Sequence, residues 1–178
     1  EEINKNVELG IIRNHYVGRI FIEPTQQIRS LGVKLKHNVN KSLIKNKSLI
    51  LIDDSLVRGT TSVKIIKMLY ETGAKEVHLR IASPPIKYPD YYGVDTPNKS
   101  ELLASKNNVE EMRKIVNAKT LKFLSIEGLY KSMGYEKRNS SYPQFTDHCF
   151  TGDYPIKPLD SNDKDFMDSQ LSFMESKS

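Results

Sequence analysis

The sequence predicts an α/β fold in which an open parallel sheet is flanked by helices. The first observation is the continuous apolar run at 48–52, which is typical of a strand buried on both faces of a parallel sheet. The second is a helical pattern at 62–72 that ends at Gly73, and the third is another short apolar run at 77–82. Strand, helix and strand in this order predict a βαβ unit with a right-handed crossover.

The alternation of helix and strand continues downstream. Asn108 can cap a helix, and Ser125 can cap a second helix that ends at Gly134, with a strand at 120–124 between them. The predicted inward side chains of the first helix are Val109, Met112, Ile115 and Val116. Those of the second are Ile126, Leu129, Tyr130 and Met133. We expect 136–158 to be loop, and 160–178 to form either a polar C-terminal tail or a docking helix.

Composition limits the classes of protein that this chain can belong to. Its 178 residues are enough for one domain, and 38% hydrophobic with 28% charged residues is ordinary for a globular protein. No apolar stretch approaches the roughly 18 residues that cross a bilayer, so we expect no membrane partner. The lone cysteine, Cys149, excludes an intramolecular disulfide and favours a reducing, cytoplasmic location.

The charge is unevenly distributed along the chain. The formal net charge is +5, but no acidic residue occurs between Glu23 and Asp53. The basic residues in that stretch are Arg29, Lys34, Lys36, Lys41, Lys45 and Lys47. This pattern allows either a solvated lysine-rich face or a site near an anionic ligand.

The sequence 49–61 carries the strongest chemical signal. Asp53 and Asp54 follow the apolar strand directly, at the end where ligands bind in open parallel sheets. Gly59 permits a tight turn, so that the backbone N–H groups near the next helix can converge on a phosphate. Two adjacent carboxylates suit the vicinal hydroxyls of a sugar and a hydrated Mg²⁺. Together these residues predict a sugar-phosphate site, although an Asp-Asp pair alone is also typical of a turn.

The string Leu-Ile-Leu-Ile-Asp-Asp-Ser-Leu-Val-Arg-Gly-Thr-Thr at 49–61 resembles the phosphoribosyl-diphosphate (PRPP) signature of the type I phosphoribosyltransferases. Its Arg-Gly-Thr-Thr ending resembles the amidophosphoribosyltransferases in particular. The segment 13–24 is similar to the catalytic lid of that family, and 82–96 is similar to a further family segment. The resemblance implies that 1–159 is the C-terminal portion of a phosphoribosyltransferase domain whose sheet is incomplete at its N-terminal side, with a lid at 13–27.

The resemblance also implies roles for individual residues. Asp53 and Asp54 would bind the ribose hydroxyls and Mg²⁺, and the PRPP phosphate would lie against the loop. The loop residues are Ser55, Leu56, Val57, Arg58, Gly59, Thr60 and Thr61. The lid contacts that assist catalysis would be Arg13, Tyr16 and Arg19, and the ammonia channel would be walled by Tyr16, Ile22 and Leu102.

The implied reaction is transfer of glutamine-derived ammonia to C1 of PRPP in the first step of purine synthesis. The resemblance implies purine nucleotides as inhibitors, a homo-oligomer, and a glutaminase domain that is absent from this chain. Asp90 occupies the place of one ligand of the iron-sulfur cluster that some members carry, so we expect no cluster. The isolated chain is expected to be unstable or aggregated.

Two other functions are possible from the sequence. A PRPP-sensing regulator could share this fold and use the basic stretch at 29–47 to bind nucleic acid, but the modest net charge makes nucleic acid an improbable partner. The chain could also be an inactive remnant. A Cys149 nucleophile is disfavoured, because the adjacent His148 cannot readily point at it.

Overall fold

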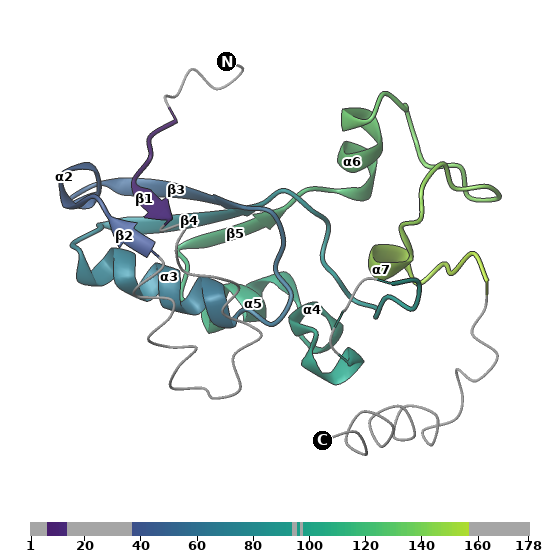
Figure 1. Ribbon diagram of the computed structural model, residues 1–178, viewed down its shortest axis with the longest axis horizontal. Coiled ribbons are helices and arrows are strands. Elements are labelled where there is room, and N and C mark those ends of the chain that lie inside the picture. Colours follow the sequence, from purple (N-terminus) through teal and green to yellow (C-terminus); the bar gives the residue numbers. More distant parts are fainter. Residues whose placement is uncertain (1–6, 14–36, 94–95, 97, 157–178) are drawn as a thin grey trace.

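The computed structural model describes residues 7–13, 37–93, 96 and 98–156 (Figure 1). A parallel three-stranded sheet lies at its centre, in the order β3-β4-β5. These strands comprise Ser48–Asp53, Glu76–Ile81 and Thr120–Phe123 respectively. Leu51 is paired with Leu79, and Leu79 with Leu121, so the apolar residues of the three strands are in register. The predicted parallel α/β architecture is therefore confirmed.

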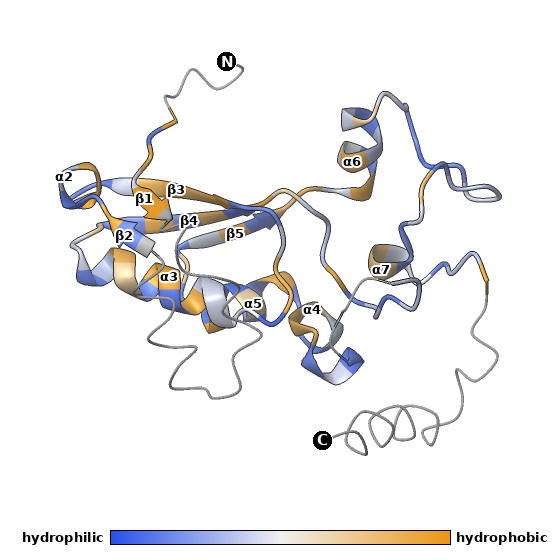
Figure 2. Cartoon of the chain, in the orientation of Figure 1, coloured by the Kyte–Doolittle hydropathy of each residue, from blue (hydrophilic) through white to orange (hydrophobic). Residues whose placement is uncertain are grey.

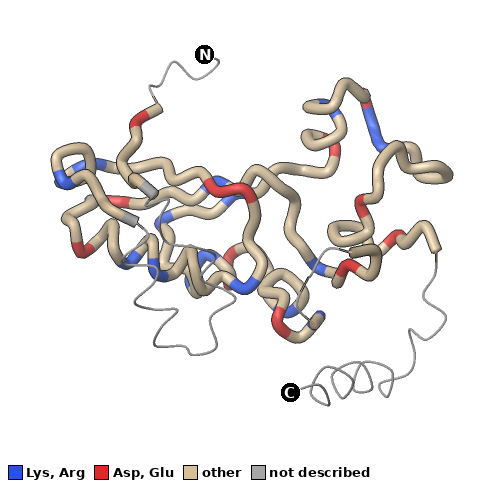
Figure 3. Tube along the Cα trace, in the orientation of Figure 1, with Lys and Arg blue, Asp and Glu red and all other residues tan. Residues whose placement is uncertain are grey.

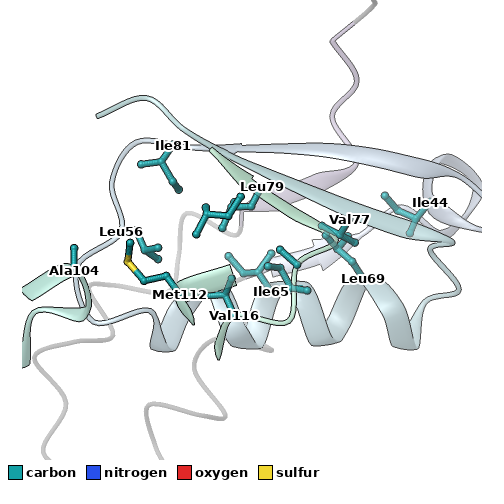
Figure 4. Packing of buried hydrophobic residues seen from close by; sticks show 13 residues of the cluster. Ile44, Leu56, Ile65, Leu69, Val77, Leu79, Ile81, Ala104, Met112 and Val116 are labelled. Atoms are coloured by element: carbon teal, nitrogen blue, oxygen red, sulfur yellow. The ribbon is translucent and has the colours of Figure 1, made fainter. Parts of the chain in front are cut away.

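Two helices cover one side of this sheet. Helix α3, Thr60–Glu71, connects β3 to β4, and α5, Val109–Ile115, lies between β4 and β5 (Figure 1). Figure 4 shows how the core forms between these helices and the strands, with side chains from both layers in contact. The fully buried members include Ile66, Leu69, Val77, Leu79, Met112 and Val116. Burying side chains of this size stabilises the fold by about 1.5–3 kcal/mol each.

The opposite face of β3 corrects one prediction. The strand was expected to be buried on both faces, yet its side chains alternate between half-buried and exposed. Ile50 and Ile52 are 54% and 68% exposed, although Figure 2 shows β3 as a largely hydrophobic strand. The reason is that α3 and α5 lie on the same side of the sheet, and no helix of the described residues covers this part of the other side.

The predicted helix starts are confirmed, but the predicted buried stripes are too wide. Asn108 accepts a hydrogen bond from the Glu111 N–H in a capping box, and Ser125 caps α6, Ile126–Ser132. However, three of the predicted inward side chains are 42–47% exposed: Val109, Ile115 and Met133. Both helices are only seven residues long, so each buries one turn against the fold and exposes its ends.

The remaining elements are short. Strands β1, Ile11–Arg13, and β2, His37–Val39, form a separate antiparallel pair, followed by α2, Lys41–Ile44. A 3-10 helix, η2, Lys99–Glu101, precedes α4, Leu103–Lys106. The segment 136–158 was predicted to be loop, and within its described part it contains one short helix, α7, His148–Thr151. Four residues give no periodicity that a sequence pattern could reveal.

Candidate functional site

The carboxyl ends of the three parallel strands form one edge of the sheet, and the predicted site lies at this edge. The Asp53 carbonyl accepts a hydrogen bond from the Ala82 N–H at 2.9 Å, so the ladder between β3 and β4 continues to the end of the strand. Figure 3 shows an acidic segment where the chain leaves β3. The prediction that two carboxylates lie at the ligand-binding edge of an open parallel sheet therefore agrees with the fold.

Local hydrogen bonds fix the two aspartates. The Asp53 carboxylate accepts from the Asp54 N–H at 3.1 Å, and the Asp54 carboxylate accepts from the Ser55 hydroxyl at 2.9 Å. Asp54 is exposed and Asp53 is half-buried. Both carboxylates thus lie at the surface of the edge with short-range hydrogen bonds that hold their orientation, which suits them to accept hydrogen bonds from a ligand's hydroxyl groups.

The loop after the aspartates is anchored in the core and then turns sharply into α3. Leu56 is only 2% exposed and packs in the main hydrophobic cluster, which it shares with Ile65 of α3. Gly59 has a left-handed backbone conformation, with φ of 78°, and α3 begins at the next residue. Any other residue type would be strained at this position, because a Cβ atom disfavours positive φ.

The N-terminus of α3 has no side-chain cap. Three other helices of the described chain have one: Asn40 caps α2, Asn108 caps α5 and Ser125 caps α6. In α3 the cap residue is Gly59, and no side chain accepts a hydrogen bond there. The first N–H groups of a helix lack intrahelical acceptors and carry a partial positive charge, so an uncapped start of this kind can bind a phosphate. The exposed hydroxyls of Thr60 and Thr61 lie in the same turn.

Most of the predicted lid lies outside the described residues. This applies to Tyr16, Arg19 and Ile22, and to the lid segment from residue 14 to residue 27. Arg13 ends β1, where its backbone is paired with His37 of β2. The possible docking helix at 160–178 also lies outside the described part of the chain.

Leu102, the third predicted channel residue, is 1% exposed and lies between η2 and α4. The residues on either side of it contact the phosphate loop. Leu103 donates its N–H to the Val57 carbonyl at 2.8 Å, and Glu101 accepts from Arg58 Nε at 2.7 Å. Sequence reasoning missed both contacts, since no local pattern relates residues more than 40 positions apart.

The basic stretch is only partly described. Arg29, Lys34 and Lys36 lie outside the described residues, whereas Lys41, Lys45 and Lys47 are exposed around α2. Figure 3 shows Lys and Arg in other elements of the described chain as well. The described part therefore supports the interpretation of these three lysines as a solvated face.

A second polar cluster, also missed by sequence reasoning, lies around α7. Asp147 accepts hydrogen bonds from Arg138 Nε at 2.5 Å and from the Tyr130 hydroxyl at 2.9 Å. Burial alone would raise the pKa of Asp147, but the hydrogen bonds from Arg138 and Tyr130 outweigh it and hold the pKa below its ordinary value. Arg138 also donates to Asp153 at 2.6 Å. This cluster holds α6, the loop and α7 together.

Cys149 and Asp90 are placed close to this cluster. Burial, followed by the charge of Asp90, raises the pKa of the Cys149 thiol, which disfavours the thiolate form. The Asp90 carboxylate lies 2.8 Å from His148 Nε2 and accepts from the Tyr92 N–H. Across 7–13, 37–93, 96 and 98–156, no group of three or more His, Cys, Asp or Glu side chains is arranged to hold a metal ion.

None of the described helices is long and apolar enough to cross a membrane.

The parallel sheet, the acidic end of β3 and the uncapped glycine-started helix together define the class of the domain. These features are those of a type I phosphoribosyltransferase fold, and the similarity to solved structures confirms it. The glutamine PRPP amidotransferase of B. subtilis, solved with ADP and GMP, matches with a TM-score of 0.69 and 49% identity. The match covers 83% of this chain and 32% of that protein.

Curated relatives identify the family within this class. The amidophosphoribosyltransferase of Rhizobium etli is 58% identical over 95% of this chain, and that of Bacillus subtilis is 49% identical over 84%. Chloroplastic amidophosphoribosyltransferase 2 of Arabidopsis thaliana is 50% identical over 91%. This chain is therefore homologous to the amidophosphoribosyltransferases, in the phosphoribosyltransferase part of those proteins. It spans about a third of their length, between 28% and 34% of these three. No family model matches the chain.

Proposed function

We propose that this chain forms the PRPP-binding part of an amidophosphoribosyltransferase. In the proposed reaction, ammonia derived from glutamine attacks C1 of PRPP, the C1–oxygen bond to pyrophosphate breaks, and 5-phosphoribosylamine is formed. This is the first step of purine biosynthesis. The observation that supports the proposal most directly is the uncapped N-terminus of α3, which follows Asp53 and Asp54 at the ligand-binding edge of the sheet.

The loop 55–61 is proposed to bind the 5-phosphate of PRPP. Its turn at Gly59 leads into the positive end of a twelve-residue helix, and backbone N–H groups there lack side-chain acceptors. Charge-assisted hydrogen bonds from such groups favour a dianionic phosphate over neutral ligands. Asp53 and Asp54 would then lie near the ribose, where carboxylates accept hydrogen bonds from the two ring hydroxyls.

Magnesium is the cofactor that these carboxylates fit. Mg²⁺ usually keeps several waters and takes one or two protein carboxylates together with phosphate oxygens of the substrate. Asp53 and Asp54 supply that number of carboxylates, and their half-buried and exposed positions leave room for a hydrated ion. When bound, the ion would neutralise charge on the departing pyrophosphate. The iron-sulfur cluster of some family members is not expected here, since Cys149 is the lone cysteine of the sequence.

Residues of the lid segment are proposed to complete the site over bound PRPP. Arg13, Tyr16 and Arg19 would contact the substrate, and Tyr16, Ile22 and Leu102 would line the path of ammonia. Exclusion of water matters for this reaction, because water competes with ammonia as a nucleophile. A basic and partly apolar segment serves both purposes, since its arginines balance the phosphate charge and its apolar side chains exclude solvent.

The remaining partners are proposed by analogy with the homologous proteins. A glutaminase domain would supply ammonia, and purine nucleotides are proposed as inhibitors, in keeping with the ADP and GMP in the structure of the B. subtilis relative. A homo-oligomer in the cytoplasm is the proposed state. Nucleic acid is not a proposed partner.

Calorimetric titration with PRPP and Mg²⁺ tests the proposal. With this chain replacing the corresponding third of a complete relative, we expect binding of Mg-PRPP and loss of the binding heat in Asp53→Asn/Asp54→Asn, which removes both negative charges while preserving side-chain size. The matched control is Glu127→Gln, because Glu127 is an exposed acid on α6 far along the chain from the loop. Equal binding by the double variant and the wild type would contradict the assigned roles of the aspartates.

A second measurement tests the reaction itself. Ammonia-dependent release of pyrophosphate from PRPP should be measured in a chimera, in which this chain replaces the corresponding third of a complete relative. Activity that needs Asp53 and Asp54 would support the proposed transfer. PRPP binding without any turnover in that setting would instead favour a sensor that retains the site without the chemistry.

A further inference from the structure

The phosphate loop is held from outside by three contacts with the segment 99–103. The Val57 carbonyl accepts a hydrogen bond from the Leu103 N–H at 2.8 Å. Arg58 Nε donates to Glu101 Oε2 at 2.7 Å, in an ion pair. The third contact is at Gly59, where a Cβ atom would lie 2.9 Å from Leu103 Cδ2. Three consecutive loop residues therefore contact two residues of one short segment.

This segment surrounds Leu102, the described residue of the proposed ammonia path. Leu102 is 1% exposed, while Glu101 on one side and Leu103 on the other both contact the loop. The backbone hydrogen bond between Leu103 and Val57 fixes the distance between the two segments. A displacement of the loop at Val57–Gly59 would consequently displace Leu102, because a trans peptide chain cannot stretch.

The Arg58 side chain is held by one of its nitrogens only. Its Nε–H is taken by Glu101, and neither terminal nitrogen donates a hydrogen bond within the described residues. A guanidinium carries five N–H donors, so four remain for an anion. The side chain is 49% exposed, which leaves it accessible to a ligand at the loop. Without Glu101 a long arginine side chain would have to be ordered when the ligand binds, at a cost in rotamer entropy.

We infer that Glu101 is a positioning residue of this site: it holds the Arg58 guanidinium beside the phosphate loop with its terminal nitrogens available to an anionic group of PRPP, while Leu103 couples the loop to Leu102. This inference rests on the proposed function, since it requires that the loop binds PRPP. Glu101 acts through Arg58 and does not itself contact the substrate. The negative charge of Glu101 opposes binding of an anion, so its benefit comes from the hydrogen bond to Nε.

Two substitutions separate the hydrogen bond from the charge. Glu101→Ala removes both, whereas Glu101→Gln keeps an oxygen acceptor for Arg58 Nε and removes the charge. We expect Glu101→Ala to raise the Kd for Mg-PRPP roughly two- to five-fold, the range for loss of an exposed ion pair. Glu101→Gln should bind as well as the wild type or more tightly. The matched control is Glu110→Ala, which removes an exposed acid paired with Arg113 at 2.6 Å in α5.

A double-mutant cycle provides the decisive test. In the Arg58→Ala background, Glu101→Ala should have no further effect on the Kd, because there is no guanidinium left to position. The same fold-change in both backgrounds, or no change from Glu101→Ala in the wild-type background, would overturn the inference. If the wild-type chain, folded in place of the corresponding third of a complete relative, binds no PRPP, it is the proposed function that fails.

Amide hydrogen exchange tests the contact between the segments without any ligand. The Leu103 N–H should be protected in the wild type, because it is bonded to Val57. Glu101→Ala should accelerate its exchange roughly two- to five-fold, the same ratio as for the ion pair, and Glu110→Ala should leave it unchanged. An unchanged rate in Glu101→Ala would overturn the coupling between Glu101 and the loop, whatever the result with PRPP.

Discussion

His148 Nε2 lies 2.8 Å from the Asp90 carboxylate, and this contact joins α7 to a loop 58 residues earlier in the chain. The imidazole is 2% exposed and its Nδ1 has no hydrogen-bond partner within the described residues. Tyr92 and Tyr154 enclose the ring, each with its centroid 5.0 Å away. The histidine therefore donates a hydrogen bond through Nε2 and is otherwise held by aromatic packing. It connects α7 to the loop that contains Asp90.

His148→Ala should lower the free energy of unfolding by about 3 kcal/mol, since it opens a cavity and removes the partner of a carboxylate that is mostly buried. Urea unfolding followed by circular dichroism measures this. His78→Ala is the control, because His78 is more exposed and lies on the open face of the sheet. A loss no larger than that of the control would contradict the role assigned to His148.

Acid should weaken the cluster around Asp147. Because the pKa of Asp147 is lowered in the fold, the unfolded state binds the proton more tightly. The stability that Asp147 contributes is therefore complete above the unfolded pKa of about 4, and is lost as the pH falls through the lower folded value. The free energy of unfolding should be compared between wild type and Asp147→Asn from neutral to strongly acidic pH. The difference should shrink in acid, and a constant difference would contradict the assigned cause.

Cys149 should react slowly with thiol reagents in the folded protein. Burial and then the charge of Asp90 raise its pKa, so the thiolate is scarce at neutral pH. Alkylation by iodoacetamide at pH 7 should be slower than in the urea-unfolded chain. Cys149 is the sole cysteine, so mass spectrometry reports on it directly. Equal rates in both states would show that the thiol is neither buried nor electrostatically protected.

The exposed face of β3 should promote self-association of the chain. Ile50 and Ile52 lie on the same face and are both more than half exposed. Ile50→Thr/Ile52→Thr keeps β-branched residues in the strand and should reduce association with little change in stability, because neither side chain is in the core. Light scattering against concentration measures association. Undiminished association in the double variant would place the aggregating surface elsewhere.

Much of the central fold could be predicted because its elements have strong local signals. The apolar run of β3, the helix cap at Asn108 and the helix-ending Gly73 each occur where the pattern indicated. The burial of β3 could not be predicted in the same way. A continuous apolar strand indicates two packed faces, but which faces are covered depends on where distant helices lie, and both α3 and α5 lie on the same side.

In the candidate site, too, residues close in sequence could be predicted to lie together, whereas contacts between distant residues could not. Asp53, Asp54 and Gly59 form one contiguous string, so their proximity at the strand end was predictable from 49–61. The pairing of Arg58 with Glu101 was not, because it depends on how the chain returns to the loop after β4. The same applies to Arg138 and Asp147, whose contact forms across a loop with no periodicity.

Gly59→Ala should damage the phosphate loop in two separable ways. The new Cβ would be strained at φ of 78° and would lie 2.9 Å from Leu103 Cδ2. Gly134→Ala is a matched control for the first effect, since Gly134 has φ of 86° and nothing within 4 Å of the added atom. We expect Gly134→Ala to lower the free energy of unfolding by about 1–2 kcal/mol through backbone strain alone, and Gly59→Ala to lower it by more.

Adding Leu103→Ala to Gly59→Ala should restore PRPP binding in part, because it removes the close contact with the new Cβ atom while the backbone strain remains. Equal losses of unfolding free energy at the two glycines would mean that Leu103 does not crowd a side chain at Gly59. Calorimetric titration of the three variants with Mg-PRPP measures the effect on binding.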